Sequence, residues 1–307
     1  MTTLITGAAG FLGSHIVRRL VARGDSVRAL DLRPGVDLVA DVTDREAVVR
    51  AMHGVARVIH VAAIYELGTR DVARMERVNV AGTENVLSAA RDAGIPAVHV
   101  STVAALGSTG IDLADETHWN DEAPRSAYAA TKRAAHLVAR RHRARIAMPA
   151  TIFGPGDPSM FGRAHRLLRR APFGVVARPE MRLCFVHVED CADGVIRVAD
   201  RGLRARSAGL DEGGEWVLSA GVLPLGEWLS RFKRPALTVP DRVLDLGAAL
   251  AARLPAAVRE RSPALRLLEE AGAMSAGVHW SFDGRRAREE LGWSPRPIES
   301  CIADAAA

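Results

Sequence analysis

The sequence predicts an α/β fold with a doubly wound, mostly parallel β-sheet and a smaller C-terminal α/β lobe. Two observations support this class. Residues 1–31 read as a strand, a glycine-rich turn, a helix and a second strand, and short apolar strands then alternate with amphipathic helical segments. We expect residues 1–153 to form the main domain, residues 184–200 to return to it, and residues 154–307 to form most of the second lobe.

The opening strand and turn have the pattern of a nucleotide-binding unit. Thr3–Thr6 is an apolar and β-branched run that suits a buried parallel strand. Three glycines follow at three-residue spacing: Gly7 allows a tight turn, Gly10 lets backbone N–H groups approach a pyrophosphate, and Gly13 lets the helix pack closely. The helix predicted at Phe11–Arg23 would point its free N–H groups and partial positive charge at the phosphates.

A carboxylate ends the second strand, which is predicted at Ser26–Leu30. Asp31 lies eighteen residues after Gly13, near the distance expected for an acid that binds a ribose. A glycine triplet alone also occurs in ordinary turns, but the strand before it, the helix after it and this acid together predict a dinucleotide site. Asp31 favours NAD because its charge would repel a 2′-phosphate, while Arg33 keeps NADP possible.

Two polar residues of the next segments are candidate site residues. A third strand is predicted at Val36–Ala40, and Asp41 follows it. Asp41 either meets an adenine edge or caps the helix that opens at Thr43–Glu46, and both interpretations stay open. A helix is then predicted at Asp71–Asp92 with Asn79 in its middle.

The fourth and fifth strands end in small or hydroxyl-bearing residues. Arg57–Val61 is the fourth strand, and the small residues Ala62 and Ala63 after it would let a dinucleotide lie across the sheet edge. His60 is expected to pack rather than react. Ala97–Val100 is the fifth strand and brings Ser101–Thr102 to the carboxyl end of the sheet, where ligands bind in open α/β folds.

A tyrosine and a lysine lie one helical turn apart in the next helix. This helix is predicted at Ser126–Arg143, and the spacing of four puts Tyr128 and Lys132 on one face. Such pairs are common on surface helices. Here the chain has only two tyrosines, and Thr102 precedes Tyr128 by twenty-six residues in a chain that begins with a dinucleotide fingerprint.

These motifs together resemble the extended short-chain dehydrogenase/reductase family, within the NAD-dependent epimerase/dehydratase group and nearer its dihydroflavonol reductase and 3β-hydroxysteroid dehydrogenase branch. The resemblance covers most of the chain and is specific for the family, though not for a substrate. It rests on the segments Thr6–Gly13, His60–Ala63, Asn79–Asn85, Ser101–Thr102, Tyr128 with Lys132, Gly154–Asp157, Phe185–Asp190 and Glu290–Pro295.

The resemblance implies three catalytic residues. Tyr128 would be the general acid/base, Lys132 would bind the nicotinamide ribose and lower the tyrosine pKa, and Thr102 would hold the substrate oxygen. The pKa of a phenol, ordinarily about 10, must fall by roughly 2.5 units for the group to be half ionised near neutrality, which corresponds to about 3.4 kcal/mol. One cation at ~4–5 Å supplies about 3–4 kcal/mol at an effective dielectric of 20, so Lys132 could provide that shift.

The fingerprint and the resemblance also predict which residues contact the cofactor and the substrate. Substrate contacts are expected at Tyr65, Val103, Ala104 and Ile152. Further candidates for lining the pocket are Glu66, His165 and Arg178. The cofactor contacts are expected at Gly7, Gly10, Phe11, Leu12, Gly13, Asp31, Leu32, Arg33, Asp41, Val42, Val61, Ala62, Ala63, Asn79, Tyr128, Lys132 and Pro149.

Several departures from the family pattern narrow the reaction. Val103-Ala104-Ala105 replaces the Asp-Glu pair that dehydratases carry after the catalytic Thr, and that loop lacks the Cys or His of epimerases that react through an enolate. Leu183 and Met148-Pro149 stand where nucleotide-sugar enzymes usually have arginines. These departures favour a smaller or more apolar ketone or alcohol over a nucleotide sugar.

An apolar stripe in the second half has two interpretations. The helix predicted at Asp241–Leu254 carries Val243, Leu244, Leu246, Leu250 and Leu254 on one stripe, with Leu265, Leu267 and Leu268 beyond it. The stripe is either the core of the small lobe, which we favour, or a cover over a hydrophobic substrate pocket. Ser159–Arg170 also reads as a helix, and Trp280 and Trp293 are expected to be packing anchors.

The sequence therefore predicts an NAD(P)-dependent oxidoreductase that interconverts a secondary alcohol and a ketone by hydride transfer, with Tyr128 as acid/base. One alternative is a nucleotide-sugar 4-epimerase, which needs only the tyrosine, a bound NAD and a rotating keto-sugar. A second alternative is a non-catalytic dinucleotide-binding regulator. The presence of Thr102, Tyr128 and Lys132 argues against it, because a binding sensor does not need all three.

Composition excludes several other classes. The 41 basic and 36 acidic residues are scattered along the 307-residue chain without a basic tail, which predicts a solvated surface rather than a nucleic-acid footprint. Cys184, Cys191 and Cys301 fit neither a disulfide framework nor a metal site. With no signal peptide and no membrane-length apolar run, we expect a cytoplasmic enzyme with a small-molecule substrate and no membrane partner. The family resemblance adds a homodimer formed through the two long helices.

Overall fold

The computed structural model describes residues 1–66, 71–159, 161–163, 166, 174–207, 213–231, 235–262, 265 and 278–305. Its main sheet has seven strands in the order β10-β6-β5-β4-β1-β2-β3, and every neighbouring pair is parallel. The strands are β1 (Thr2–Thr6), β2 (Ser26–Asp31), β3 (Leu38–Val39), β4 (Arg57–His60), β5 (Ala97–Val100), β6 (Arg145–Pro149) and β10 (Gly214–Leu218).

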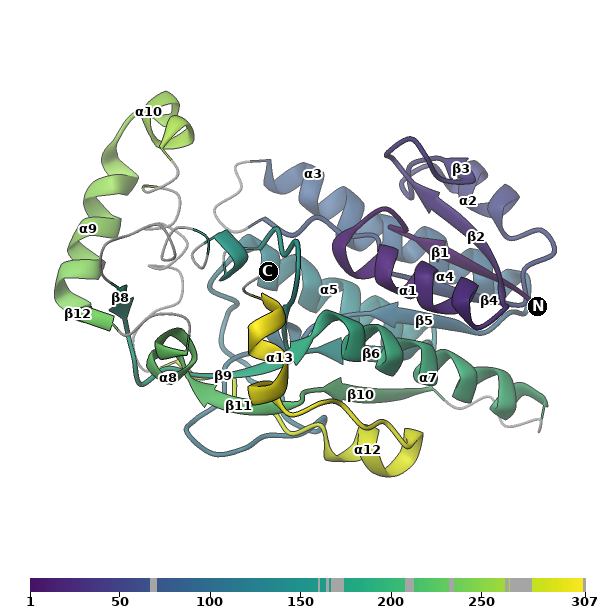
Figure 1. Ribbon diagram of the computed structural model, residues 1–307. Coiled ribbons are helices and arrows are strands. Elements are labelled where there is room, and N and C mark those ends of the chain that lie inside the picture. Colours follow the sequence, from purple (N-terminus) through teal and green to yellow (C-terminus); the bar gives the residue numbers. More distant parts are fainter. Residues whose placement is uncertain are drawn as a thin grey trace.

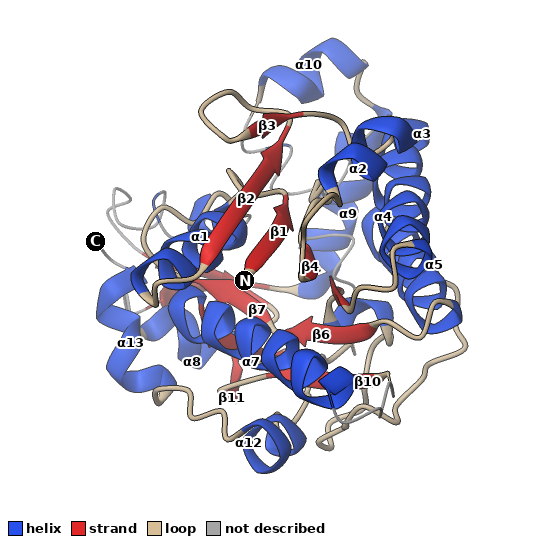
Figure 2. Ribbon diagram, turned by 90° about the vertical axis from the view of Figure 1, so that its right-hand side faces the viewer, coloured by secondary structure: helices blue, strands red, loops and turns tan. Residues whose placement is uncertain are grey.

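Helices cover both faces of this sheet, as the doubly wound prediction requires (Figures 1 and 2). One face carries α1 (Phe11–Ala22) and α7 (Val188–Ser207), and the other carries α2 (Arg45–Ala51), α4 (Gly82–Asp92) and α5 (Ala127–Arg141). The strand order reverses direction between β1 and β4, which creates the crevice where ligands of such sheets bind. The fold class predicted from the sequence is confirmed.

The helix predicted at Asp71–Asp92 is present but contains an irregular turn. It consists of α3 (Val72–Glu76), one π-helical turn η1 (Arg77–Ala81) and α4. The Asp71 side chain caps the start by accepting a hydrogen bond from Arg74 N at 2.9 Å. The π-turn holds Asn79, and such single turns often mark functional positions within helices.

The second lobe is built on two small sheets. One has the order β11-β9-β7, with β7 (Thr151–Phe153), β9 (Arg182–His187) and β11 (Gly221–Pro224), and the other pairs β8 (Gly174–Ala177) with β12 (Pro235–Val239). Phe185 of β9 stacks on Trp228 with ring centroids 4.1 Å apart, at the centre of this lobe's core. Its helices are α8 (Leu225–Ser230), α9 (Asp241–Arg253), α10 (Ala256–Arg261), α12 (Arg285–Leu291) and α13 (Ile298–Ala305).

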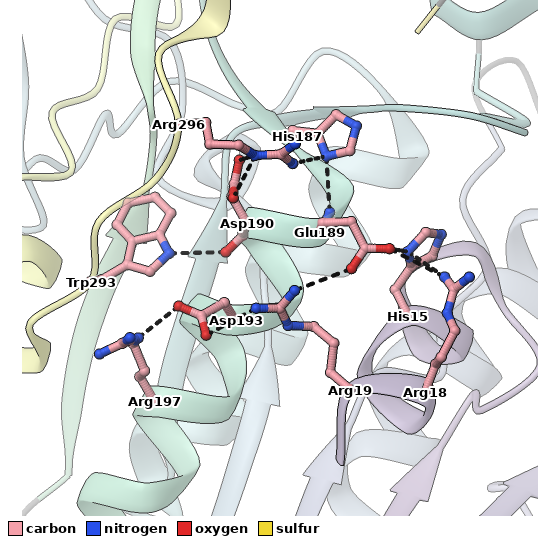
Figure 3. A network of polar contacts seen from close by, with 10 residues as sticks. All are labelled: His15, Arg18, Arg19, His187, Glu189, Asp190, Asp193, Arg197, Trp293 and Arg296. Atoms are coloured by element: carbon pink, nitrogen blue, oxygen red, sulfur yellow. Dashed lines mark hydrogen bonds and ion pairs between the residues drawn. The ribbon is translucent and has the colours of Figure 1, made fainter. Parts of the chain in front are cut away.

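The segment that returns to the main sheet is longer than residues 184–200. Helix α7 runs to Ser207 along α1, and β10 then forms the edge of the seven-stranded sheet. A polar network fixes α7 to α1, because Glu189 accepts from Arg19 at 3.3 Å and contacts His15 Nδ1 at 2.5 Å (Figure 3). Trp293 Nε1 donates to the Asp190 carbonyl at 2.9 Å, so the C-terminal segment is tied to the same helix.

The apolar stripe of α9 follows neither interpretation. Val243, Leu246, Leu250 and Leu254 are 40–62% exposed, and of the five stripe residues only Leu244 is buried. The buried guanidinium of Arg178 explains the orientation, because it draws Asp245 (2.6 Å) and Asp241 (3.6 Å) of the same helix inward. Leu267, Leu268, His165 and most of the helix predicted at Ser159–Arg170 lie outside the described residues.

Candidate functional site

A cavity of about 830 Å³ opens at the carboxyl ends of β1, β2, β4, β5 and β6. Its wall contains the predicted catalytic residues, the predicted substrate residues and the predicted cofactor residues, with one exception, Asn79. The cavity also reaches the second lobe through Phe161, Leu183, Val278 and Trp280. One concave site therefore collects residues that are up to 273 positions apart in the sequence, from Gly7 to Trp280.

The glycine turn leaves no space for side chains between β1 and α1. Gly7 has a φ of +70°, and a Cβ atom there would lie 2.6 Å from the backbone nitrogen of Ala62. A Cβ atom on Gly13 would collide with the carbonyl oxygen of Gly7. Gly10, at the N-cap of α1, provides no side-chain cap, so the first N–H groups of this helix face the cavity without a side-chain partner. This cradle fits a dinucleotide pyrophosphate.

Asp31 lies at the end of β2 on the adjacent wall of the cavity. Its carboxylate is only 8% exposed and accepts hydrogen bonds from the backbone N–H groups of Ala9 and Arg33, each at 3.0 Å. A carboxylate offers about four acceptor positions, so two remain for the hydroxyls of a ribose. The Arg33 guanidinium is 63% exposed, with Nε 3.5 Å from the Asp31 carboxylate.

The structure decides between two roles of Asp41. The cap of α2 is Asp44, which accepts a hydrogen bond from Ala47 N at 3.0 Å. Asp41 instead accepts from Thr43 N at 2.8 Å and lies in the cavity wall, so its interpretation as the helix cap is wrong. The sequence could not separate the two because Asp41 and Asp44 are both acceptable caps three residues apart.

Asn79 is the predicted cofactor residue that does not line the cavity. It is 1% exposed, and its side-chain amide accepts from Ile64 N at 2.7 Å and donates to Ile64 O and Thr131 Oγ1, both at 3.1 Å. A direct contact between Asn79 and the cofactor therefore stays a prediction, and in this structure the side chain binds the backbone beside the cavity. Asn79 holds the backbone of the cavity wall after β4. The sequence alone does not distinguish this structural role from ligand binding.

His60 packs rather than reacts, as expected. Its ring contacts Thr6 Oγ1 at 2.7 Å and Thr83 Oγ1 at 3.0 Å. Burial and the charge of Lys132 lower the pKa of His60 to about 3, so the ring is neutral.

The two hydroxyls predicted to be catalytic meet between β5 and α5. Ser126 caps α5 by accepting from Ala129 N at 3.1 Å, and Tyr128 follows in the first turn of the helix. Thr102 lies two residues after β5, and its hydroxyl is close enough to the Tyr128 phenol to lower the pKa of that phenol. The Tyr65 ring meets the Tyr128 ring edge-on at 4.8 Å, so both tyrosines of the chain lie in this wall.

The ionisation of Tyr128 differs from the sequence expectation. Burial raises the pKa of Tyr128 to about 12, against the hydrogen bond from Thr102, which lowers it. Lys132 is also buried, which lowers its pKa to about 8, and its ammonium donates to the Val100 carbonyl at 2.8 Å. Without a ligand, Lys132 is therefore directed to the backbone of β5, and the expected lowering of the tyrosine pKa is absent.

The cavity wall beyond the cofactor residues contains apolar side chains together with the polar side chains of Asp157 and Ser159. The predicted residues Val103, Ala104 and Ile152 lie there with Tyr65. Leu183, which stands where nucleotide-sugar enzymes usually have an arginine, also lines the cavity. The sequence missed Phe161 and Val278, because nothing in their local pattern shows that the second lobe folds back over the sheet. Trp280, expected only to anchor packing, also lines the cavity, whereas Arg178 and Glu66 do not.

The described residues contain no group of acidic, histidine or cysteine side chains that could hold a metal ion. The three cysteines are buried free thiols, as predicted. In the described part of the chain no helix combines the length and apolar character needed to cross a membrane.

Comparisons with known proteins agree with the fold and the cavity. The sequence profile described as "NAD dependent epimerase/dehydratase family" matches residues 3–208. The chain is 31% identical to "Sterol demethylase protein B" of Methylococcus capsulatus, over 100% of this chain and 98% of the relative. It is 30% identical to "4-hydroxy-2-methyl-3-oxo-4-farnesyl-3,4-dihydroquinoline-1-oxide ketoreductase" of Stigmatella aurantiaca, over 96% of this chain and 92% of the relative.

A solved structure matches over nearly the whole length. The protein described as "gox2253" superposes with a TM-score of 0.77 at 30% identity, covering 99% of this chain and 96% of that chain. The match includes both the main sheet and the second lobe.

Proposed function

The chain belongs to the NAD-dependent epimerase/dehydratase family, in the extended short-chain dehydrogenase/reductase group, and is an NAD-dependent enzyme. Within this family we propose that it interconverts a ketone and a secondary alcohol on a small or apolar substrate. The observation that carries the proposal is that Thr102, Tyr128 and Lys132 line one cavity, whose wall also holds the apolar side chains of the second lobe.

In this proposal three side chains have separate roles beside the cofactor. When bound, NAD would accept a hydride, or its reduced form would donate one. Thr102 donates a hydrogen bond to the substrate oxygen, and Tyr128 transfers a proton to or from that oxygen. Lys132 binds the ribose hydroxyls once a ligand offers them in place of the Val100 carbonyl. The neutral phenol is already the correct form to donate a proton to a ketone, so reduction needs no change in ionisation before the reaction.

The cofactor preference follows from Asp31. Its carboxylate is positioned to accept hydrogen bonds from both hydroxyls of the adenine ribose and to repel a 2′-phosphate. We propose that NAD is used in preference to NADP, with the exposed Arg33 as the only cation beside Asp31 among the described contacts of that carboxylate.

An apolar substrate is supported by the cavity wall and by the names of two relatives. Leu183, Val278 and Trp280 line the substrate end of the cavity. The relatives are named after a sterol and after a farnesylated dihydroquinoline oxide, both largely apolar molecules. A nucleotide-sugar 4-epimerase is the alternative, which the absence of arginines at positions 148 and 183 disfavours. A non-catalytic regulator is the second alternative, and it would leave Tyr128 and Thr102 in the cavity wall without a role.

We also propose a cytoplasmic homodimer that associates through α3–α4 and α5. Val72 and Leu137 on these helices are 42% and 39% exposed. The two-domain division at residue 153 is likewise a proposal, with α7 and β10 added to the main domain.

The test is a screen by nicotinamide absorbance at 340 nm with NADH and three ketones, cyclohexanone, androstenedione and dihydroquercetin; the epimerase alternative is tested separately by following the conversion of UDP-glucose to UDP-galactose. Tyr128→Phe should lose about 100-fold or more of the turnover, since a positioned acid/base contributes that much, and should keep its Kd for NADH. His142→Leu, on the same helix and outside the cavity wall, is the control and should retain most of the turnover. Unchanged turnover in Tyr128→Phe would refute the catalytic assignment.

A further inference from the structure

Behind the catalytic hydroxyls, three polar side chains form a buried chain that the reaction itself does not use. Ser101 Oγ lies 3.0 Å from His136 Nδ1, and His136 Nε2 lies 3.3 Å from a carboxylate oxygen of Glu215, at ion-pair distance. His136 is fully buried and Ser101 is 5% exposed. Burying Ser101 and His136 is costly unless their polar atoms are paired, and they are paired with each other, with the half-buried Glu215 beside them.

The chain joins the two elements that carry the catalytic residues. Ser101 is the residue before Thr102 at the end of β5, whereas His136 lies on α5, one turn after Lys132. Glu215 comes from β10 at the edge of the sheet. The Ser101–His136 contact therefore connects the Thr102 strand directly to the Tyr128 helix.

Glu215 is itself held in a fixed orientation. Arg140 binds it through two contacts, Nε to Oε1 at 2.6 Å and a terminal nitrogen to Oε2 at 2.9 Å. Burial opposes its ionisation, yet His136 and Arg140 together lower the pKa of Glu215 to about 2. The Arg140 guanidinium also lies 4.9 Å from the centre of the Trp119 ring, which covers this group.

The two contacts of His136 differ in kind. Its Nε2 atom lies 3.3 Å from the Glu215 carboxylate without hydrogen-bond geometry, so this contact is electrostatic, whereas its Nδ1 atom and Ser101 Oγ are hydrogen-bonded at 3.0 Å. Arg133 adds a second link between the same elements by donating to the Ala105 carbonyl at 3.0 Å, three residues after Thr102.

We propose that Ser101, His136 and Glu215 are positioning residues that hold the Thr102 hydroxyl at the right distance from the Tyr128 phenol. The proposal rests on the proposed function. Apolar packing alone allows a strand and a helix to slide by fractions of an ångström, whereas a buried directional hydrogen bond does not. Loss of these contacts should therefore lower kcat and leave cofactor binding unchanged.

The test compares His136→Leu, His136→Gln and Ser101→Ala with a matched control on the same helix. His142 pairs with Glu84 at 2.6 Å near the C-terminal end of α5, so His142→Leu removes a similar pair without touching β5. We expect His136→Leu and Ser101→Ala to lower kcat about 10- to 100-fold with the fastest ketone of the screen, with KM and the Kd for NADH within about 2-fold. His136→Gln should recover part of the loss, and His142→Leu should keep kcat.

Hydrogen exchange of the backbone amides at 101–106 gives a readout independent of turnover. Exchange in this segment should be faster in His136→Leu than in His142→Leu. The positioning role is wrong if Ser101→Ala and His136→Leu keep kcat and exchange rates, or if His142→Leu loses as much. Because Ser101→Ala removes only one oxygen atom, its kcat and exchange rates test the positioning role even where His136→Leu does not fold. If Tyr128→Phe is fully active, the proposed function fails; if it is inactive and Ser101→Ala is unimpaired, only the positioning role fails.

Discussion

The ionisation of Tyr128 gives the sharpest test of the site, because the chain has only two tyrosines. In Tyr65→Phe, Tyr128 is the only phenol, so its ionisation can be followed by absorbance at 295 nm. The structure raises its pKa from 10.0 to about 12 through burial. Two units correspond to about 2.7 kcal/mol favouring the neutral phenol. We therefore expect no phenolate absorbance in the folded protein below about pH 11.

The same shift predicts how stability changes with pH. The unfolded phenol ionises near pH 10 and the folded one near pH 12, so the contribution of Tyr128 is complete below pH 10. It is lost as the pH rises from 10 to 12. The free energy of unfolding of Tyr65→Phe should therefore fall by up to about 2.7 kcal/mol more over this range than that of Tyr65→Phe/Tyr128→Phe.

A phenolate signal near pH 8 in the ligand-free protein would refute this reasoning. It would mean that Lys132 faces Tyr128 rather than the Val100 carbonyl. Repeating the titration with NAD⁺ tests whether bound positive charge lowers the tyrosine pKa, in which case the 295 nm signal moves to lower pH. If NAD⁺ leaves the titration of Tyr128 at 295 nm unchanged, bound positive charge does not lower the pKa of Tyr128, and the side chain acts only as a proton donor.

Two further substitutions test the cofactor end of the cavity. Asp31→Ser removes the charge that repels a 2′-phosphate, so the ratio of kcat/KM for NADPH to that for NADH should rise at least ~10-fold, and an unchanged ratio would contradict the role of Asp31. Asn79→Leu leaves Ile64 N and O without partners, so the free energy of unfolding should fall by about 2–3 kcal/mol in urea titrations and the Kd for NADH should rise; an unchanged Kd would show that this wall does not depend on Asn79.

The sequence predicted the cofactor half of the site well because its signals are local. The turn at Gly7 and Gly13 needs glycine for reasons of backbone geometry, and the spacing to Asp31 is set by one helix and one strand. Tyr128 and Lys132 share a helix face by periodicity alone. Each of these residues lies in the cavity wall where the pattern placed it.

The sequence predicted contacts that depend on packing less well. Asn79 belongs to the π-turn, and its side chain binds Ile64 and Thr131 rather than lining the cavity. The stripe on α9 faces outward because Arg178 binds the opposite side of that helix. Phe161 and Val278 reach the cavity only because the second lobe folds over the sheet. Long-range placement of this kind depends on the tertiary fold, which a periodicity of one segment does not contain.

The pKa values of Tyr128 and Lys132 both shift toward the uncharged form of the side chain. Burial disfavours charge on both, so the pKa of Tyr128 rises while that of Lys132 falls to about 8. A pKa near 12 leaves a phenolate at neutral pH about five units away, or roughly 7 kcal/mol, which the ligand-free site does not offset. The protonated phenol can donate its proton to a ketone oxygen without this free-energy cost. In the proposed reaction, the protonated phenol is therefore the form that reduces a ketone. In the direction of alcohol oxidation, the positive charge of the oxidised nicotinamide would first have to lower the pKa of Tyr128, which is the shift that the titration with NAD⁺ measures.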